Sequence, residues 1–202
     1  MSIEKSNEFF ENIYKESAGD TDKVPWAILD TNPYLLEYLK QHIGEGKAIV
    51  IGCGLGHDAL ALDDAGFDVT AIDISETAIN WCKNEYDYTD IDFKVQDIFE
   101  LPESMLGKYD FIFEALTIQS LPLEYRNQII GAIASLMAPN AKVLAVADGK
   151  NEGERYEGPP WPLEHNELRL FQNYNCEELE FSIFEGTRST LKFRALYKKS
   201  TT

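Results

Sequence analysis

Three glycines at alternate positions follow a short apolar run near residue 50, and this pattern suits the binding of a nucleoside or nucleotide. The segment IGCGLG occupies residues 51–56, and residues typical of a helix follow it directly. Because glycine has no Cβ, the chain can turn tightly here and a ligand can approach the backbone. Free N–H groups at the start of the helix would then face that ligand. Glycine turns between a strand and a helix also serve packing alone, so this segment needs support from elsewhere in the chain.

Polar residues stand after three further apolar runs, where they could bind the parts of a nucleoside cofactor. Asp73 lies 17 residues after Gly56, and a carboxylate at this position can accept hydrogen bonds from both ribose hydroxyls. Each such bond is worth about 1.5–3 kcal/mol, although Asp73 could instead only help to cap the next helix. Asp97 could accept a hydrogen bond from an adenine amino group, and Ile98 could cover the ring face. Glu114 would face the reacting end, where it would set the geometry of the cofactor or the acceptor.

These residues stand at the ends of elements that alternate between strand and helix. Short continuous apolar runs are typical of buried parallel strands, and apolar residues three or four positions apart are typical of helices. Strands are expected over residues 47–52, 67–73, 91–97, 109–115 and 141–147, helices over 3–17, 33–43, 57–66, 75–86, 123–137 and 163–171, and a closing hairpin around Gly186.

The alternation predicts the α/β class and a Rossmann-like, doubly wound sheet of seven strands. Right-handed crossovers make such a sheet mostly parallel, and the closing hairpin adds an antiparallel C-terminal strand. Ligands of these sheets bind beyond the carboxyl ends of the strands. We therefore expect the site just after Ile51, Ile72, Val95 and Phe113.

The composition predicts one domain over residues 1–202 and argues against several classes of partner. With 35 acidic and 18 basic residues, the net charge of −17 disfavours nucleic acids and anionic membranes. Three cysteines without a C-x-x-C pair predict a reducing compartment, and three histidines without ligand spacing predict no metal site. Neither a signal peptide nor a spanning segment is found, so we expect a cytoplasmic protein that is a monomer or weak dimer.

The spacing of the glycines favours S-adenosylmethionine over a nicotinamide dinucleotide. The dinucleotide pattern is G-x-G-x-x-G, whereas this chain has G-x-G-x-G with His57 where the last glycine would stand. A dinucleotide enzyme also needs a second region for its substrate, and little chain remains for one.

The sequence resembles class I S-adenosylmethionine-dependent methyltransferases, and in particular the thiopurine/thiol (halide) methyltransferase superfamily. The resemblance spans residues 24–197 and rests on GCGLGHDALALDDAGFDVTAIDIS at 52–75, Pro25-Trp26, DFIFE at 110–114 and GPPWPL at 158–163. The segments AILDTNP after Trp26 and ALTIQSLP after Glu114 depart from the pattern near the expected acceptor site. The resemblance therefore leaves the acceptor open.

The resemblance and the strand ends together imply a set of binding residues and two accessory segments. Residues 1–45 would form a helical cap over the cofactor site, and residues 148–172 a substrate lid. The cofactor would be bound by Trp26, Gly52, Cys53, Gly54, Asp73, Ile74, Asp97, Ile98 and Glu114. A small-molecule acceptor would contact Gln119, Arg155, Pro160 and Trp161.

The expected reaction is an in-line methyl transfer to a thiol or another soft nucleophile, and it requires no nucleophilic residue. A base or cation would help a thiol acceptor, and His57, Arg126 and Arg155 are the candidates. Three alternatives stay open at this point: an NAD(P)-dependent oxidoreductase, a non-catalytic S-adenosylmethionine-binding protein, and an enzyme that methylates proteins.

Overall fold

The computed structural model describes residues 3–17, 20–26, 30–186 and 191–201. The chain forms two compact units, Met1–Glu100 and Leu101–Thr202. Part of the AILDTNP segment (residues 27–29) and the hairpin turn (187–190) lie outside the described residues. No helix in the described part of the chain is long and apolar enough to cross a membrane.

Three parallel strands form the centre of the first unit. They are β1 (Lys47–Ile51), β2 (Asp68–Asp73) and β3 (Asp92–Val95), in the order β3-β2-β1. After its first residue β1 is buried throughout, as expected for a parallel strand covered on both faces. Parallel pairing brings the carboxyl ends of β1 and β2 to one edge, where Ile51 pairs with Ile72.

The helices of the first unit begin where the sequence supplies caps. They are α1 (Ile3–Ser17), α2 (Pro33–Leu39), α3 (His57–Asp64) and α4 (Glu76–Glu85), with a 3-10 turn at Thr21–Lys23. The Ser75 side chain accepts a hydrogen bond from the Ala78 N–H and caps α4, which confirms the expected start. The prediction that the second helix reaches Ile43 was wrong, because α2 ends at Leu39 and Ile43 is 92% exposed.

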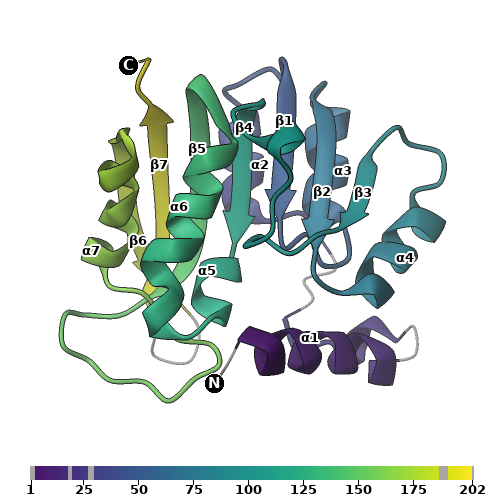
Figure 1. Ribbon diagram of the computed structural model, residues 1–202, viewed down its shortest axis with the longest axis horizontal. Coiled ribbons are helices and arrows are strands. Elements are labelled where there is room, and N and C mark those ends of the chain that lie inside the picture. Colours follow the sequence, from purple (N-terminus) through teal and green to yellow (C-terminus); the bar gives the residue numbers. More distant parts are fainter. Residues whose placement is uncertain (1–2, 18–19, 27–29, 187–190, 202) are drawn as a thin grey trace. The chain divides into compact units, whose positions relative to one another are not determined.

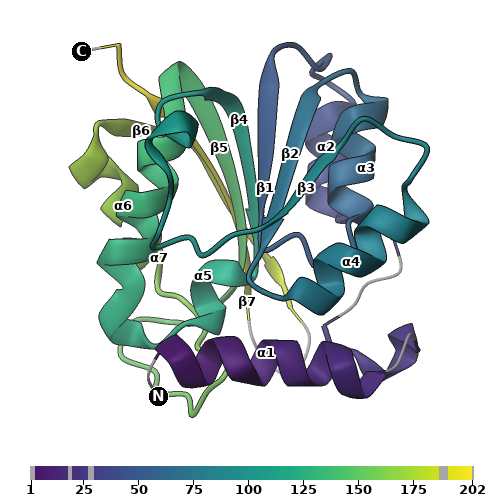
Figure 2. The same cartoon turned by 45° about the vertical axis from the view of Figure 1, so that its right-hand side comes forward.

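Helix α1 lies beyond the carboxyl ends of β1 and β2 and alongside α4 (Figures 1 and 2). The Glu11 carboxylate on α1 accepts hydrogen bonds from the Ser75 hydroxyl at 2.5 Å and the Thr77 hydroxyl at 2.8 Å. Since Ser75 and Thr77 directly follow β2, these bonds hold α1 at the edge where the ligand is expected.

The second unit contains four strands in the order β4-β5-β7-β6. They are β4 (Tyr109–Ala115), β5 (Met137–Gly149), β6 (Cys176–Glu185) and β7 (Leu191–Lys199). Strand β5 is parallel to β4, while β7 is antiparallel to both β5 and β6. The predicted α/β class, mostly parallel with an antiparallel C-terminal strand, is confirmed.

Strand β5 begins four residues earlier than the predicted start at Ala141. Proline usually ends a strand because it cannot donate to the ladder, but a bulge tolerates it. Here the register shifts between Tyr109 and Phe111, whose partners are Met137 and Lys142, so Pro139 lies within the irregular part.

The helices of the second unit differ from prediction mainly at their starts. They are α5 (Thr117–Ser120), α6 (Arg126–Leu136) and α7 (His165–Leu168), with 3-10 turns at Glu103–Met105, Leu123–Tyr125 and Arg169–Tyr174. The helix predicted over residues 123–137 is therefore a 3-10 turn followed by α6. Figure 1 shows α6 in front of β5 and α5 below it.

Candidate functional site

The glycine loop after β1 has a left-handed backbone at each glycine. The φ angles are 64° at Gly52, 53° at Gly54 and 85° at Gly56. Gly52 is exposed, so its backbone is open to a ligand. Gly56 is buried, and a Cβ there would lie 2.8 Å from the Tyr86 ring. The glycines of the loop thus have different roles. Gly52 is placed for the approach of a ligand, whereas Gly56 is required for packing.

The Asp73 carboxylate closes the same loop from the end of β2. One oxygen accepts a hydrogen bond from the Gly54 N–H and the other from the Ser75 N–H, each at 2.9 Å. Burial raises the pKa of Asp73, against the lowering effect of these backbone bonds. The Ile74 N–H contributes a further, smaller backbone bond, but a carboxylate offers about four acceptor positions, so Asp73 keeps acceptor capacity. Asp73 therefore organises the loop and start of α4 and can still bind a ligand.

Two further predicted contacts, Asp97 and Ile98, lie in a turn after β3. An Asp97 carboxylate oxygen accepts from the Phe99 N–H at 2.8 Å, and the Gln96 side chain donates to the Asp97 carbonyl at 2.9 Å. Both predicted contact residues are half-buried. These bonds order the turn, while the adenine contact itself stays a prediction.

Trp26 is anchored on α1 by its indole nitrogen. Its Nε1–H donates to the Tyr14 hydroxyl at 2.9 Å, and its ring meets Phe10 edge-on with centroids 5.2 Å apart. The indole is partly buried against a cluster that includes the loop residue Leu55. Trp26 is thus both a packing residue against α1 and a neighbour of the glycine loop.

Cys53 and Ile74 occupy the loop as backbone and packing elements. Cys53 is 8% exposed, and its N–H donates to the Ile72 carbonyl at 2.9 Å. Its hydrogen bond with Cys82, and then burial, raise the pKa of the Cys53 thiol. The thiolate is therefore disfavoured, which agrees with a packing role. Ile74 is half-buried between Asp73 and Ser75.

Glu114 is a fully buried carboxyl group at the end of β4. One oxygen accepts from the Thr117 and Ile118 N–H groups, both at 3.1 Å. The other, Oε1, has no hydrogen-bond partner among the described residues. Burial raises the pKa of Glu114 to about 7, although the two backbone bonds and the Arg126 charge lower it. A buried oxygen without a partner is costly and often marks a functional position.

The Gln119 side chain joins α5 to the end of β5. Its Nε2 donates to an Asp148 carboxylate oxygen at 2.8 Å, and its Oε1 accepts from the Asp148 N–H. The Gln119 carbonyl also accepts from the Trp161 N–H at 2.8 Å. Gln119 is 2% exposed with both ends of its amide engaged, so it positions the loop that begins at Asp148.

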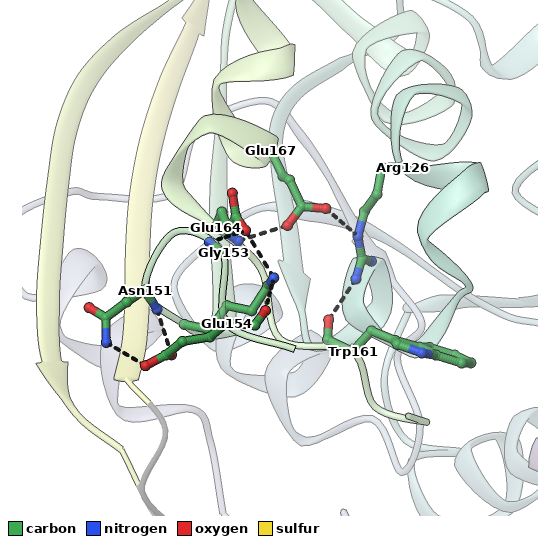
Figure 3. Close-up of polar contacts among 8 residues, drawn as sticks. Arg126, Asn151, Gly153, Glu154, Trp161, Glu164 and Glu167 are labelled. Carbon is green, nitrogen blue, oxygen red and sulfur yellow. Dashed lines mark hydrogen bonds and ion pairs between the residues drawn. The ribbon is translucent and has the colours of Figure 1, made fainter. Parts of the chain in front are cut away.

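Arg126 holds the other end of that loop, a role that the sequence did not reveal (Figure 3). Its guanidinium donates to the carbonyls of Trp161, at 2.6 Å, and Ile118, and pairs with Glu167 at 3.3 Å. It is 4% exposed, and burial lowers its pKa. Arg126 is one of the three candidates for a base or cation near the acceptor, but its donors are directed to two backbone carbonyls and to Glu167.

The loop is further ordered by contacts along its own length. Lys150 pairs with Glu164 at 3.0 Å, the Gly153 N–H donates to the same Glu164 oxygen, and Asn151 donates twice to the Glu154 carboxylate (Figure 3). These bonds give the segment a defined shape.

The tip of the loop presents proline and tryptophan. Pro160 and Arg155 are exposed, and Trp161 is half-buried. A Cβ on Gly158 would lie 2.4 Å from the Trp161 ring, so only glycine allows the ring to pack there. In Figure 3 the Trp161 carbonyl points to Arg126, while the indole extends away from the loop.

Replacement of Arg126 by methionine is expected to lower the free energy of unfolding by about 3 kcal/mol, since it leaves two buried carbonyls and Glu167 without their partner. Urea unfolding measures this loss. Arg169→Met, at an exposed position, is the control and should change stability little. If Arg126→Met and Arg169→Met both change the free energy of unfolding only slightly, Arg126 does not anchor the loop.

Two residues near the glycine loop, Asp58 and Tyr14, are not among the residues that the sequence analysis predicts for the site. Asp58 on α3 accepts a hydrogen bond from the Asn32 N–H at 2.7 Å, and burial raises its pKa to about 6. Tyr14 is a buried residue of α1, within the helix predicted over residues 3–17. His57, a candidate base, is half-buried at the start of α3, with its ring edge-on to Tyr86.

Comparison with known proteins identifies the family. The chain matches the model of the Thiopurine S-methyltransferase (TPMT) family over residues 16–196. The chain belongs to this family. It is therefore an S-adenosylmethionine-dependent methyltransferase from a family that acts on small molecules.

Individual relatives agree with this assignment. The chain is 27% identical to the 2-heptyl-1-hydroxyquinolin-4(1H)-one methyltransferase of Mycobacteroides abscessus, over 82% of this chain and 75% of that protein. It is 22% identical to the probable thiol methyltransferase 2 of Arabidopsis thaliana, over 100% and 94%. The fold resembles 1,6-didemethyltoxoflavin-N1-methyltransferase of Burkholderia thailandensis, solved with S-adenosylhomocysteine, with a TM-score of 0.78 and 15% identity over 99% and 91%.

The residues of the first unit fit this cofactor. Gly52 is exposed at the glycine loop, and Asp73 keeps acceptor capacity for hydroxyl groups. Family membership also favours S-adenosylmethionine over the nicotinamide cofactor that the glycines alone left open.

Proposed function

We propose that this enzyme methylates the sulfur of a small, largely apolar thiol, or another soft nucleophile. The observation that carries the proposal is the loop at residues 158–163, where Pro160 and Trp161 are held in place through Arg126 and Gln119. A flat apolar surface of this kind suits an aromatic or heteroaromatic acceptor better than a charged one. The names of the relatives, which include thiol and thiopurine methyltransferases, support the same class.

The cofactor-binding residues in this proposal are those at the ends of β1, β2 and β3. Asp73 accepts hydrogen bonds from the ribose hydroxyls, Asp97 accepts one from the adenine amino group, and Ile98 and Ile74 cover the ring. Gly52, Cys53 and Gly54 give close backbone approach, and Trp26 packs from the cap formed by residues 1–45. When bound, S-adenosylmethionine supplies a methyl group already activated by its sulfonium. The chain's task is therefore alignment, which is worth about 7–11 kcal/mol at best.

The acceptor-binding residues in this proposal belong to the second unit. Glu114, whose Oε1 has no hydrogen-bond partner among the described residues, sets the geometry of the reacting groups. Gln119 holds the start of the lid, residues 148–172, and Pro160, Trp161 and Arg155 bind the acceptor and exclude water. An aliphatic thiol has a pKa of about 8.5, so most of it is protonated at neutral pH. Its proton must pass to a base or to water as the sulfur takes up the methyl group and S-adenosylhomocysteine leaves.

The test is a panel of acceptors with methyl-labelled S-adenosylmethionine. Aromatic and aliphatic thiols, halides, amines and an N-hydroxyquinolone are compared for label in the product. We expect transfer to aromatic thiols at the highest kcat/KM. Faster transfer to amines or to the N-hydroxyquinolone would overturn the thiol assignment.

Substitution of Trp161 by alanine is expected to raise the acceptor KM about tenfold and to leave the KM for S-adenosylmethionine nearly unchanged, because the indole would lose its apolar contact with the acceptor. Steady-state kinetics with each substrate varied in turn measures both. Tyr156→Ala, an exposed aromatic in the same loop, is the matched control. An equal rise in both constants would assign the loop to the cofactor instead.

A further inference from the structure

Tyr14 has a buried hydroxyl group that accepts one hydrogen bond and donates none to the described residues. It lies on α1, the helix across the carboxyl ends of β1 and β2, and is 5% exposed. The Trp26 indole N–H donates to its oxygen at 2.9 Å, so an acceptor position of the hydroxyl is filled. The hydroxyl must then direct its own proton elsewhere, and no acceptor for it is found among the described residues. A buried donor of this kind needs an acceptor, which a water or a ligand group can supply.

The hydroxyl lies at the glycine loop. A Cβ built on Gly54 would be 3.0 Å from the Tyr14 oxygen. The N–H of the same glycine donates to Asp73, so Tyr14, Gly54 and Asp73 meet at one place. A ligand group that rests on the backbone of Gly54 therefore comes within hydrogen-bond reach of the phenol.

The surroundings keep the phenol in its donor form. Burial, and then the Asp73 charge, raise the pKa of Tyr14 far from neutrality. Glu11 adds a second carboxylate near Asp73. Residues 1–100 contain no arginine, and Lys15 on α1 pairs with Glu11 at 3.1 Å. At the glycine loop, neutral donors such as backbone N–H groups and the phenol O–H are therefore available to an anionic ligand group.

We propose that the Tyr14 hydroxyl, oriented by Trp26, donates a hydrogen bond to the methionyl carboxylate of S-adenosylmethionine where the cofactor passes Gly54. The carboxylate is the strongest acceptor on the cofactor and the group most in need of a donor beside two acidic side chains. Tyr14 is thus a cofactor-binding residue, and Trp26 acts through it. This inference rests on the proposed placement of the cofactor at the glycine loop.

The test is Tyr14→Phe, which removes the hydroxyl and keeps the ring. Calorimetry compares S-adenosylhomocysteine with 5′-methylthioadenosine, which has the same nucleoside but lacks the amino-acid part. We expect about a tenfold weaker affinity for S-adenosylhomocysteine and an unchanged affinity for methylthioadenosine. An equal loss for both ligands would place the bond on the nucleoside, and no loss for either would remove it; both results overturn the proposal.

Two further variants separate binding from structure. Tyr86→Phe, a buried tyrosine on the far side of the loop, should leave both affinities unchanged. Trp26→Phe should weaken the binding of S-adenosylhomocysteine more in the wild type than in Tyr14→Phe, because part of the effect of the indole passes through the phenol. Additive losses would contradict that coupling. If Asp73→Asn weakens the binding of neither ligand, the placement of the cofactor is wrong. If Asp73→Asn weakens the binding of both ligands and Tyr14→Phe weakens the binding of neither, only the present inference fails.

Discussion

Replacing Asp73 by alanine is expected to weaken the binding of S-adenosylhomocysteine at least 100-fold. Two hydrogen bonds from ribose hydroxyls to a carboxylate are worth about 3–6 kcal/mol together, and about 2.8 kcal/mol already corresponds to 100-fold. The same substitution removes the acceptor for the Gly54 and Ser75 N–H groups, so the loop also loses its preorganised shape. Isothermal titration calorimetry measures the affinity directly.

The controls for this experiment come from the same strand. Asp68→Ala removes an exposed carboxylate at the opposite end of β2, where it pairs with Lys47, and should leave the affinity unchanged. Asp73→Asn keeps one acceptor oxygen and should give an intermediate loss. A folded Asp73→Ala protein with unchanged affinity would show that the ribose lies elsewhere.

Replacing Glu114 by glutamine is expected to remove the pH dependence that this carboxyl imposes on folding. The Glu114 pKa rises from 4.5 to about 7 on burial, so its favourable contribution is fully present below pH 4.5 and is lost as the pH rises through 7. Glutamine does not titrate. The free energy of unfolding of Glu114→Gln relative to wild type should therefore increase by about 3 kcal/mol between pH 4.5 and 8.

Urea unfolding at several pH values measures this difference. Glu124→Gln, at an exposed position outside the buried site, is the control for the loss of one carboxylate. A Glu114→Gln difference that varies no more with pH than that of this control would mean that Glu114 is ionised with its ordinary pKa, and its role at the reacting end would then need another basis.

The parts of the fold that could be predicted are those set by local pattern. Strand β4 and helix α1 lie at the predicted residues, because an apolar run or an amphipathic stripe is bounded by clear breaks. Helix α5 was missed, since it has four residues and begins after Leu116, whose left-handed φ of 65° has no signature in the sequence. The early start of β5 depends on a register shift against β4, which only the folded sheet reveals.

In the site, too, the residues that could be predicted are those whose role follows from the local sequence. Asp73 and the glycine loop could be found because their chemistry follows from residue type and position after a strand. Tyr14 and Arg126 could not be assigned, because their partners lie 12 and 35 residues away along the chain. The carbonyl acceptors of Arg126 belong to the backbone, so no residue type indicates them.

The most direct test of the account is a crystal structure of the enzyme with S-adenosylhomocysteine. We expect both ribose hydroxyls within hydrogen-bond distance of Asp73, and the amino-acid part of the ligand next to Gly52 and Gly54. A structure in which the ribose contacts other groups, while Asp73 binds only Gly54 and Ser75, would contradict the proposed site.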